Sequence, residues 1–121
     1  MRTILGTPPE VVANAPPEER ARVQAVLDHI LPVSPRRAGL LNDASIVGAL
    51  PRYDVEKIAA PTLAISTADD GYHTFAGARY TAEHVPNARF IGYPSGGHML
   101  VGRDAAAAAE IVAFLRQTAK D

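Results

Sequence analysis

Apolar residues in the first part of the chain recur at the spacing of an amphipathic helix. After the proline pair at 16–17, one apolar stripe is formed by Val23, Val26, Leu27, Ile30 and Leu31. We predict a helix over 16–31, because proline is tolerated in a first turn and Pro32 cannot continue the helix. A looser apolar face between Ser34 and Pro51 predicts a second helix.

The pattern changes after residue 52, where short apolar runs alternate with helical segments. The runs 61–66 and 89–93 are bounded by proline and by polar turn residues, which is typical of buried parallel strands. Between them, Thr74 is a candidate N-cap for a helix that ends near Val85. A final helix is predicted from Asp104, with one face formed by Ile111, Val112, Leu115 and Thr118.

The predicted order is helix, helix, strand, helix, strand, helix, so the fold class is α/β. Strands that alternate with helices build parallel sheets covered by helices. We divide the chain into a helical segment, 1–51, and a βαβα segment, 52–121. A parallel sheet of only two strands is a poor core, so we expect the sheet to be incomplete.

Composition excludes several classes of protein. The chain has 121 residues, 12 Lys and Arg against 13 Asp and Glu, and no cysteine. A balanced charge disfavours nucleic-acid binding, and the lack of cysteine excludes disulfides and thiolate chemistry. No apolar run is long enough to span a membrane, and the apolar patch before Pro8 is too short for a signal peptide. We therefore expect a cytoplasmic protein.

Chemistry-bearing side chains follow both predicted strands. Asp69 and Asp70 come after the first strand, and His98 follows the second strand in a glycine-rich loop. The carboxyl ends of parallel strands meet at one edge of a sheet, where α/β folds place their sites, so a carboxylate and the imidazole could meet there. Either carboxylate could be the partner of the histidine, and a plain loop or capping role stays open for both. Asp70 with His73 is a weak metal candidate, because a third ligand is missing.

The same segments resemble the late part of an α/β hydrolase. The resemblance lies in the run 53–70, which includes Pro-Thr-Leu before an apolar strand, in the run 85–98, which ends in Gly-Gly-His, and in the closing helix around Ile111–Leu115. It implies a partial α/β-hydrolase fold, with the last two parallel strands and flanking helices in 52–121. Residues 1–51 resemble the end of the family's cap, and supply two cap-type helices.

The resemblance implies that Asp70 is the acid and His98 the general base of a catalytic triad. The substrate would be an ester, lactone or similar small carbonyl compound, hydrolysed through an acyl-enzyme without metal or organic cofactor. The chain departs from the family in having Thr67 where glycine often precedes the acid. It also lacks the Gly-x-Ser-x-Gly elbow: its serines are Ser34, Ser45, Ser66 and Ser95, and none lies in that motif.

The missing nucleophile leaves three interpretations open. The chain could be the C-terminal portion of a longer hydrolase, or one half of a split enzyme whose nucleophile lies on another polypeptide. It could also be a non-catalytic remnant or binding module that pairs through the exposed edge of its first strand, with itself or with another chain. Beyond a small-molecule substrate, the expected partner is therefore the absent N-terminal hydrolase portion or a second copy.

Overall fold

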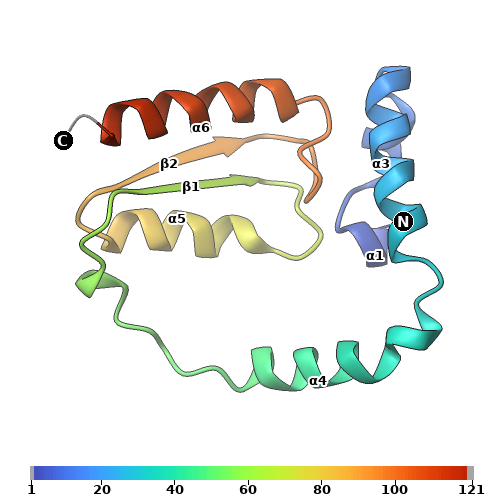
Figure 1. The fold of residues 1–121 in the computed structure, drawn as a ribbon, viewed down its shortest axis with the longest axis horizontal. Helices are drawn as coiled ribbons and strands as arrows, with labels where there is room; N and C mark the ends of the chain where they lie inside the picture. The colour runs from blue at the N-terminus through green and yellow to red at the C-terminus, as the bar shows by residue number, and fades with distance from the viewer. Residues whose placement is uncertain (1, 120–121) are drawn as a thin grey trace.

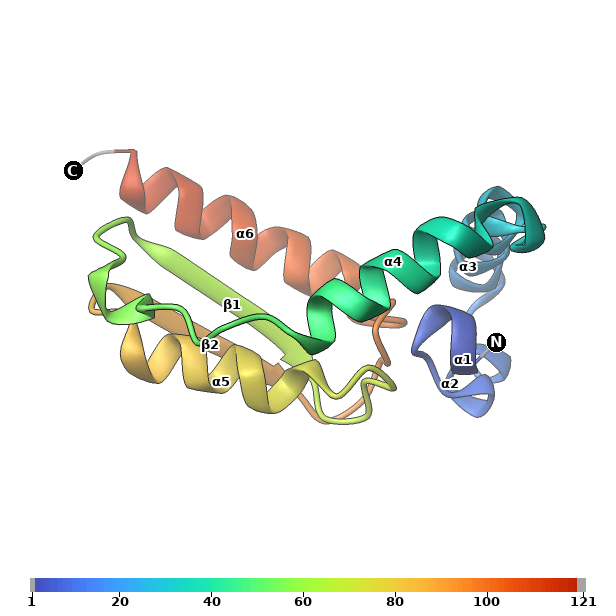
Figure 2. The same ribbon diagram turned by 90° about the horizontal axis from the view of Figure 1, so that it is seen from below.

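The computed structural model describes residues 2–119 and shows an α/β fold (Figure 1). Strands β1 (Thr62–Thr67) and β2 (Ala88–Tyr93) are parallel and paired in register from Thr62↔Ala88 to Thr67↔Tyr93. Helices α5 (Thr74–His84) and α6 (Asp104–Thr118) flank the strands from opposite sides in both views (Figures 1 and 2). The predicted α/β class, the two parallel strands and the helix between them are confirmed.

The two prolines at the start of the predicted first helix mark its beginning, with Pro16 as the N-cap residue. This helix, α3 (Pro17–Ile30), has Pro17 as its first residue and Glu18 and Glu19 next to the positive end of the helix dipole. Two short helices precede it and were not predicted: α1 (Arg2–Leu5) and α2 (Pro9–Ala13). The proline pair at 8–9 suggested a break, but Pro9 occupies the first position of a helix, where its missing N–H costs nothing.

The buried core lies between these N-terminal helices and the loop that leads into α6. Its members are Leu5, Val12, Ala15, Val23 and Val101. Val26, Leu27 and Ile30 of the predicted α3 stripe pack against it, whereas Leu31 is exposed. Residues of both predicted segments, 1–51 and 52–121, thus share one core, while the division between them stays a prediction.

The second predicted helix forms but packs against almost nothing. A short 3-10 turn, η1 (Ser34–Arg36), leads into α4 (Arg37–Gly48), and a second 3-10 turn, η2 (Val55–Lys57), precedes β1. Helix α4 stands apart from the strands, at the end of a long connection (Figure 1). None of its residues is buried, and its apolar face is exposed at Leu40, Leu41, Ile46 and Val47.

Helix α6 also leaves its predicted apolar face in solvent. It buries Ala107 and half-buries Phe114 and Thr118. Ile111, Val112 and Leu115, which the sequence pattern places on one apolar face, are all exposed. Within residues 2–119, no element covers that face.

The outer edge of β1 is open. The Thr62 N–H donates to Asn87 O at 2.9 Å and the Ala68 N–H donates to Tyr93 O at 2.8 Å. Because alternate residues of a parallel strand face the same neighbour, the backbone groups of Leu63 and Ile65 face away from β2. No third strand lies beside them among the described residues.

None of the helices in residues 2–119 is long and apolar enough to cross a lipid bilayer.

Candidate active site

The two predicted site residues lie at the same edge of the sheet. Asp70 follows β1 in a tight turn, in which its N–H donates to Thr67 O at 3.2 Å and its C=O accepts from the His73 N–H at 3.0 Å. His98 follows β2 at the end of the glycine-rich loop. Since both strands run in the same direction, their carboxyl ends bring the carboxylate and the imidazole together.

Asp70 and His98 form a direct hydrogen bond. The distance from His98 Nδ1 to Asp70 Oδ2 is 2.9 Å. The Asp70 side chain is only 3% exposed, whereas the His98 side chain is 46% exposed. An ionised carboxylate can only accept, so Nδ1 carries the proton and Nε2 of the neutral ring keeps its lone pair. The pair therefore combines a buried carboxylate with an imidazole that is open to solvent.

Two further donors hold the Asp70 carboxylate. The Tyr72 N–H donates to Oδ1 at 2.8 Å, and the Thr74 hydroxyl donates to Oδ2. Burial raises the pKa of Asp70, but the hydrogen bonds from Thr74, His98 and Tyr72 outweigh it and hold the pKa below its ordinary value. Asp70 is therefore ionised at neutral pH.

The neighbouring carboxylate has a different partner. Asp69 accepts hydrogen bonds from the N–H groups of Gly96 at 3.2 Å and Gly97 at 2.8 Å. It thereby ties the end of β1 to the loop that carries His98. The structure brings Asp70, and not Asp69, to the imidazole.

The loop before His98 needs glycine for a steric reason. Gly97 has a φ of +60°, and a Cβ built there would lie 2.6 Å from Thr7 Cα. The Thr67 hydroxyl donates to Gly97 O at 3.0 Å, and both residues are buried. Thr67 thus binds the loop that carries His98 directly.

The N-terminal segment Ile4–Thr7 forms one wall of the site, which sequence analysis missed. The Gly6 C=O accepts from two N–H groups, that of Gly71 at 2.7 Å and that of His98 at 3.0 Å. The Thr7 hydroxyl accepts from the Met99 N–H at 3.1 Å. These contacts join residues that are far apart in sequence, and only the glycine before the buried threonine could have indicated a close backbone approach.

Tyr72 closes the side of the imidazole. Its ring meets that of His98 edge-on, with centroids 4.8 Å apart, and its hydroxyl donates to Ile4 O at 2.6 Å. Gly6 lies close to both side chains: a Cβ there would be 2.7 Å from the Tyr72 ring and 2.9 Å from His98 Cβ. Tyr72 therefore packs against the base and the N-terminal segment together.

Helix α3 anchors the far side of the His98 loop. Glu19 accepts from Arg22 at 2.9 Å and from the Gly102 N–H at 3.1 Å, and Arg22 also donates to Met99 O at 2.9 Å. The hydrogen bond from Arg22 lowers the pKa of Glu19 against the opposing effect of burial. The His98 loop is thus hydrogen-bonded to residues at the end of β1, to the segment Ile4–Thr7 and to α3.

Other candidate chemistry finds less support in the geometry. His73 and Asp70 have no third metal ligand, since residues 2–119 contain no cluster of three such side chains. The hydrogen bonds of His98 within that range run to Asp70 and Gly6. Ser66 binds Thr74 instead, and no serine among these residues donates to the imidazole.

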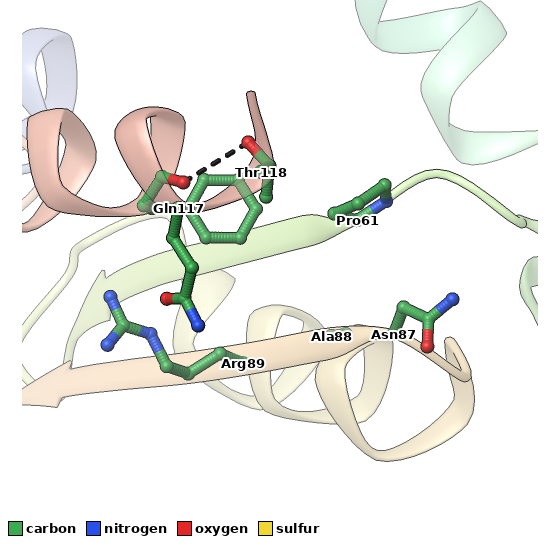
Figure 3. A pocket seen from close by; sticks show the side chains of 7 residues that line it. Pro61, Asn87, Ala88, Arg89, Gln117 and Thr118 are labelled. Atoms are coloured by element: carbon green, nitrogen blue, oxygen red, sulfur yellow. Dashed lines mark hydrogen bonds between the residues drawn. The ribbon is translucent and has the colours of Figure 1, made fainter. Parts of the chain in front are cut away.

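Two cavities lie at opposite ends of the strands. A small cavity of about 80 Å³ adjoins the acid–base pair, and its lining includes Ser66, Thr74, Asp70 and His98. A larger cavity of about 450 Å³ lies between the start of the strands and the end of α6, lined by Pro61, Asn87, Ala88, Arg89, Phe114, Gln117 and Thr118 (Figure 3). The larger cavity holds no acid–base pair, because its one charged residue, Arg89, pairs with Glu110 at 3.0 Å.

Comparison with known proteins adds no further indication. No protein-family model, curated protein or solved structure matches the chain.

Proposed function

We propose that Asp70 and His98 are the acid and the general base of a nucleophile-activating triad of the α/β-hydrolase type. The substrate class is an ester, lactone or similar small carbonyl compound. The observation that carries the proposal is the 2.9 Å bond between a buried carboxylate and an exposed imidazole. Its position at the carboxyl edge of two parallel strands supports it, because this is where α/β folds place reacting groups.

The pair can perform each proton transfer that acyl transfer requires. Nε2 of His98 accepts the proton of an attacking hydroxyl, which is a weak nucleophile at neutral pH without such a base. Asp70 holds the ring in the Nδ1–H tautomer and stabilises the imidazolium that forms. His98 then returns the proton to the leaving group, and takes another from the water that hydrolyses the acyl-enzyme.

On this reading the nucleophile lies in a polypeptide segment outside these 121 residues. Ser66, the serine nearest the pair, is buried and hydrogen-bonded to Thr74 at 2.9 Å. The open edge of β1 lies on the side away from β2, so a strand added there would end next to Asp70, which binds His98. Such a segment would belong either to a longer form of this chain or to a separate partner.

One observation favours a second candidate, a non-catalytic binding module. The unpaired backbone groups of β1 can accept a strand from any chain, including a second copy. The two candidates differ in their need for His98. Replacing the exposed imidazole leaves strand pairing intact but abolishes general-base catalysis.

The test uses the product of the native gene, tagged at its C-terminus and purified with whatever polypeptide it is joined or bound to. A fluorophosphonate probe labels activated serines, and nitrophenyl esters and lactones measure turnover. We expect labelling of a serine outside the 121 residues, and a fall in kcat of about 10⁴-fold in both His98→Ala and Asp70→Asn. His84→Ala is the matched control, because His84 stacks on Tyr80 and binds a helix carbonyl. Labelling and turnover that survive in His98→Ala would overturn the proposal.

A further inference from the structure

The side chains behind the acid form a continuous chain of hydroxyl groups. Ser66 Oγ lies 2.9 Å from Thr74 Oγ1, and Thr74 Oγ1 in turn binds Asp70 Oδ2. Ser66 is the fifth residue of β1, and Thr74 is the first residue of α5. Thr74 was predicted to cap α5. That prediction is wrong: the N-cap is His73, and no side chain makes a capping bond there.

The direction of each hydrogen bond in this chain follows from which groups carry a proton that they can donate. Asp70 is ionised, so its oxygens only accept, and the single hydroxyl proton of Thr74 must be donated to Oδ2. Thr74 then has only lone pairs to offer Ser66, which makes Ser66 the donor in the second bond. The order is therefore Ser66 to Thr74 to Asp70, with His98 donating to the same Oδ2 from the other side.

Three donors together determine the orientation of the carboxylate. The Tyr72 N–H holds Oδ1 at 2.8 Å, while Thr74 and His98 converge on Oδ2. Without the Thr74 hydroxyl, Oδ1 keeps its backbone donor, but Oδ2 is held only by the His98 imidazole that it is supposed to orient. A side chain that fixes Oδ2 therefore fixes the position of the imidazole.

We propose that Thr74 is a positioning residue that holds Asp70 Oδ2 in line with His98 Nδ1, and that Ser66 orients the Thr74 hydroxyl for this task. The inference rests on the proposed function, since it assigns a role toward the acid of the same pair. Thr74 itself is exposed, whereas Ser66 and Asp70 are buried. A substitution that removes the Thr74 hydroxyl therefore removes its hydrogen bond to Asp70 without disturbing the core.

The hydrogen bond from Thr74 to Asp70 can be removed without changing the other groups around the carboxylate. Asp69 is turned toward the amides of Gly96 and Gly97, and Tyr72 packs edge-on against the His98 ring. Hydrogen bonding by Thr74 is the strongest of the influences that lower the Asp70 pKa. A variant that removes only this hydroxyl thus has a measurable consequence at Asp70.

The test is carbon-detected NMR of the Asp70 carboxyl together with the His98 Nδ1 proton, in the 121-residue chain. In Thr74→Val we expect the Asp70 pKa to rise and the Nδ1 proton to exchange with solvent about tenfold faster, as fits the loss of one hydrogen bond to a charged group. Thr74→Ser keeps a hydroxyl and should restore both values. Ser66→Ala should shift both in the same direction by a smaller amount.

The matched control is Thr81→Val, which removes a hydroxyl of the same helix that binds only Gly77 O, at 2.9 Å. Thr74→Ala replaces Thr74→Val if the latter does not fold. The inference is overturned if Thr74→Val and Thr81→Val behave alike while Asp70→Asn still alters the His98 proton. If Asp70→Asn leaves that proton unchanged, the proposed function falls as well, so the two failures are distinguishable.

Discussion

Asp69 and Asp70 are adjacent in sequence and have different partners. Asp69 binds the backbone of the glycine loop, and Asp70 binds the imidazole that follows it. Their positions after the strand identified both as strand-end carboxylates, and only the family resemblance singled out Asp70 as the partner of His98. The choice depends on which side chain points across the sheet edge, and that requires the geometry of the turn.

The buried acid makes the stability of the chain depend on pH. The pKa of Asp70 lies below its ordinary value of 3.8, so the unfolded state binds the proton more readily than the folded state. Its contribution to stability is present above the ordinary carboxyl pKa, and is lost as the pH falls through the lower folded value. We expect Asp70→Asn to flatten the loss of unfolding free energy below about pH 4. Urea unfolding at several pH values measures the unfolding free energy of both proteins. An equal dependence of that free energy on pH in the wild type and in Asp70→Asn would contradict the prediction.

Gly97 is the residue at which the loop tolerates least change. An alanine there would combine a φ of +60° with a Cβ 2.6 Å from Thr7 Cα, which is backbone and cannot give way. We expect Gly97→Ala to lower the free energy of unfolding by about 3 kcal/mol. Gly77→Ala is the control, because nothing lies within 4 Å of a Cβ there, and we expect it to stabilise α5 by about 0.5–1 kcal/mol. Similar values for the two variants by chemical denaturation would refute the steric argument.

The contribution of Gly6 and Thr7 to the site could not be predicted from the sequence. Their partners are Gly71, His98 and Met99, more than sixty positions away. No periodicity or motif links segments so distant, and the patch was interpreted only as a short apolar run before the prolines. That Asp70 and His98 lie close together was predictable, because each is in the loop after a strand and the carboxyl ends of parallel strands meet at one edge of the sheet.

At the scale of elements, the sequence pattern predicted α3, α4 and α6 from their apolar faces, α5 from the start at Thr74, and both strands from short apolar runs, with small errors at their ends. It was less informative about burial. The apolar faces of α4 and α6 were visible in the sequence, yet the structure leaves both exposed, because periodicity shows which residues share a face and not whether anything covers it.

Because similar apolar positions differ in burial, the same substitution should lower the free energy of unfolding by different amounts at each of them. Val23 of α3 is fully buried, whereas Val47 of α4 is 66% exposed. We expect Val23→Ala to lower the free energy of unfolding by about 2 kcal/mol, and Val47→Ala to change it by less than about 0.5 kcal/mol. Denaturant unfolding of the two variants decides this. A large loss in Val47→Ala would show that α4 is covered in solution.

The whole molecule has an open sheet edge and two exposed apolar helix faces. The edge is formed by the backbone of Leu63 and Ile65, and the faces lie on α4 and α6. Apolar surface of this extent favours association, and a two-stranded sheet offers little core to resist unfolding.

We therefore expect the 121-residue chain to self-associate or to unfold with a low midpoint. If association stabilises it, the thermal midpoint rises with protein concentration by mass action. Sedimentation velocity and thermal unfolding at several concentrations test this. A monomer that unfolds sharply at a high temperature, independent of concentration, would contradict the expectation.

The proposed function requires that Asp70 holds His98 as the Nδ1–H tautomer, with Nε2 free to accept a proton. The most direct measurement is the ¹⁵N chemical shifts of the two His98 ring nitrogens at alkaline pH, where the imidazole is neutral. The geometry predicts a protonated Nδ1 in the wild-type chain, and a shift toward the Nε2–H tautomer in Asp70→Asn, whose amide can donate to Nδ1. A wild-type ring that carries its proton on Nε2, or a ring unaffected by Asp70→Asn, would contradict the account.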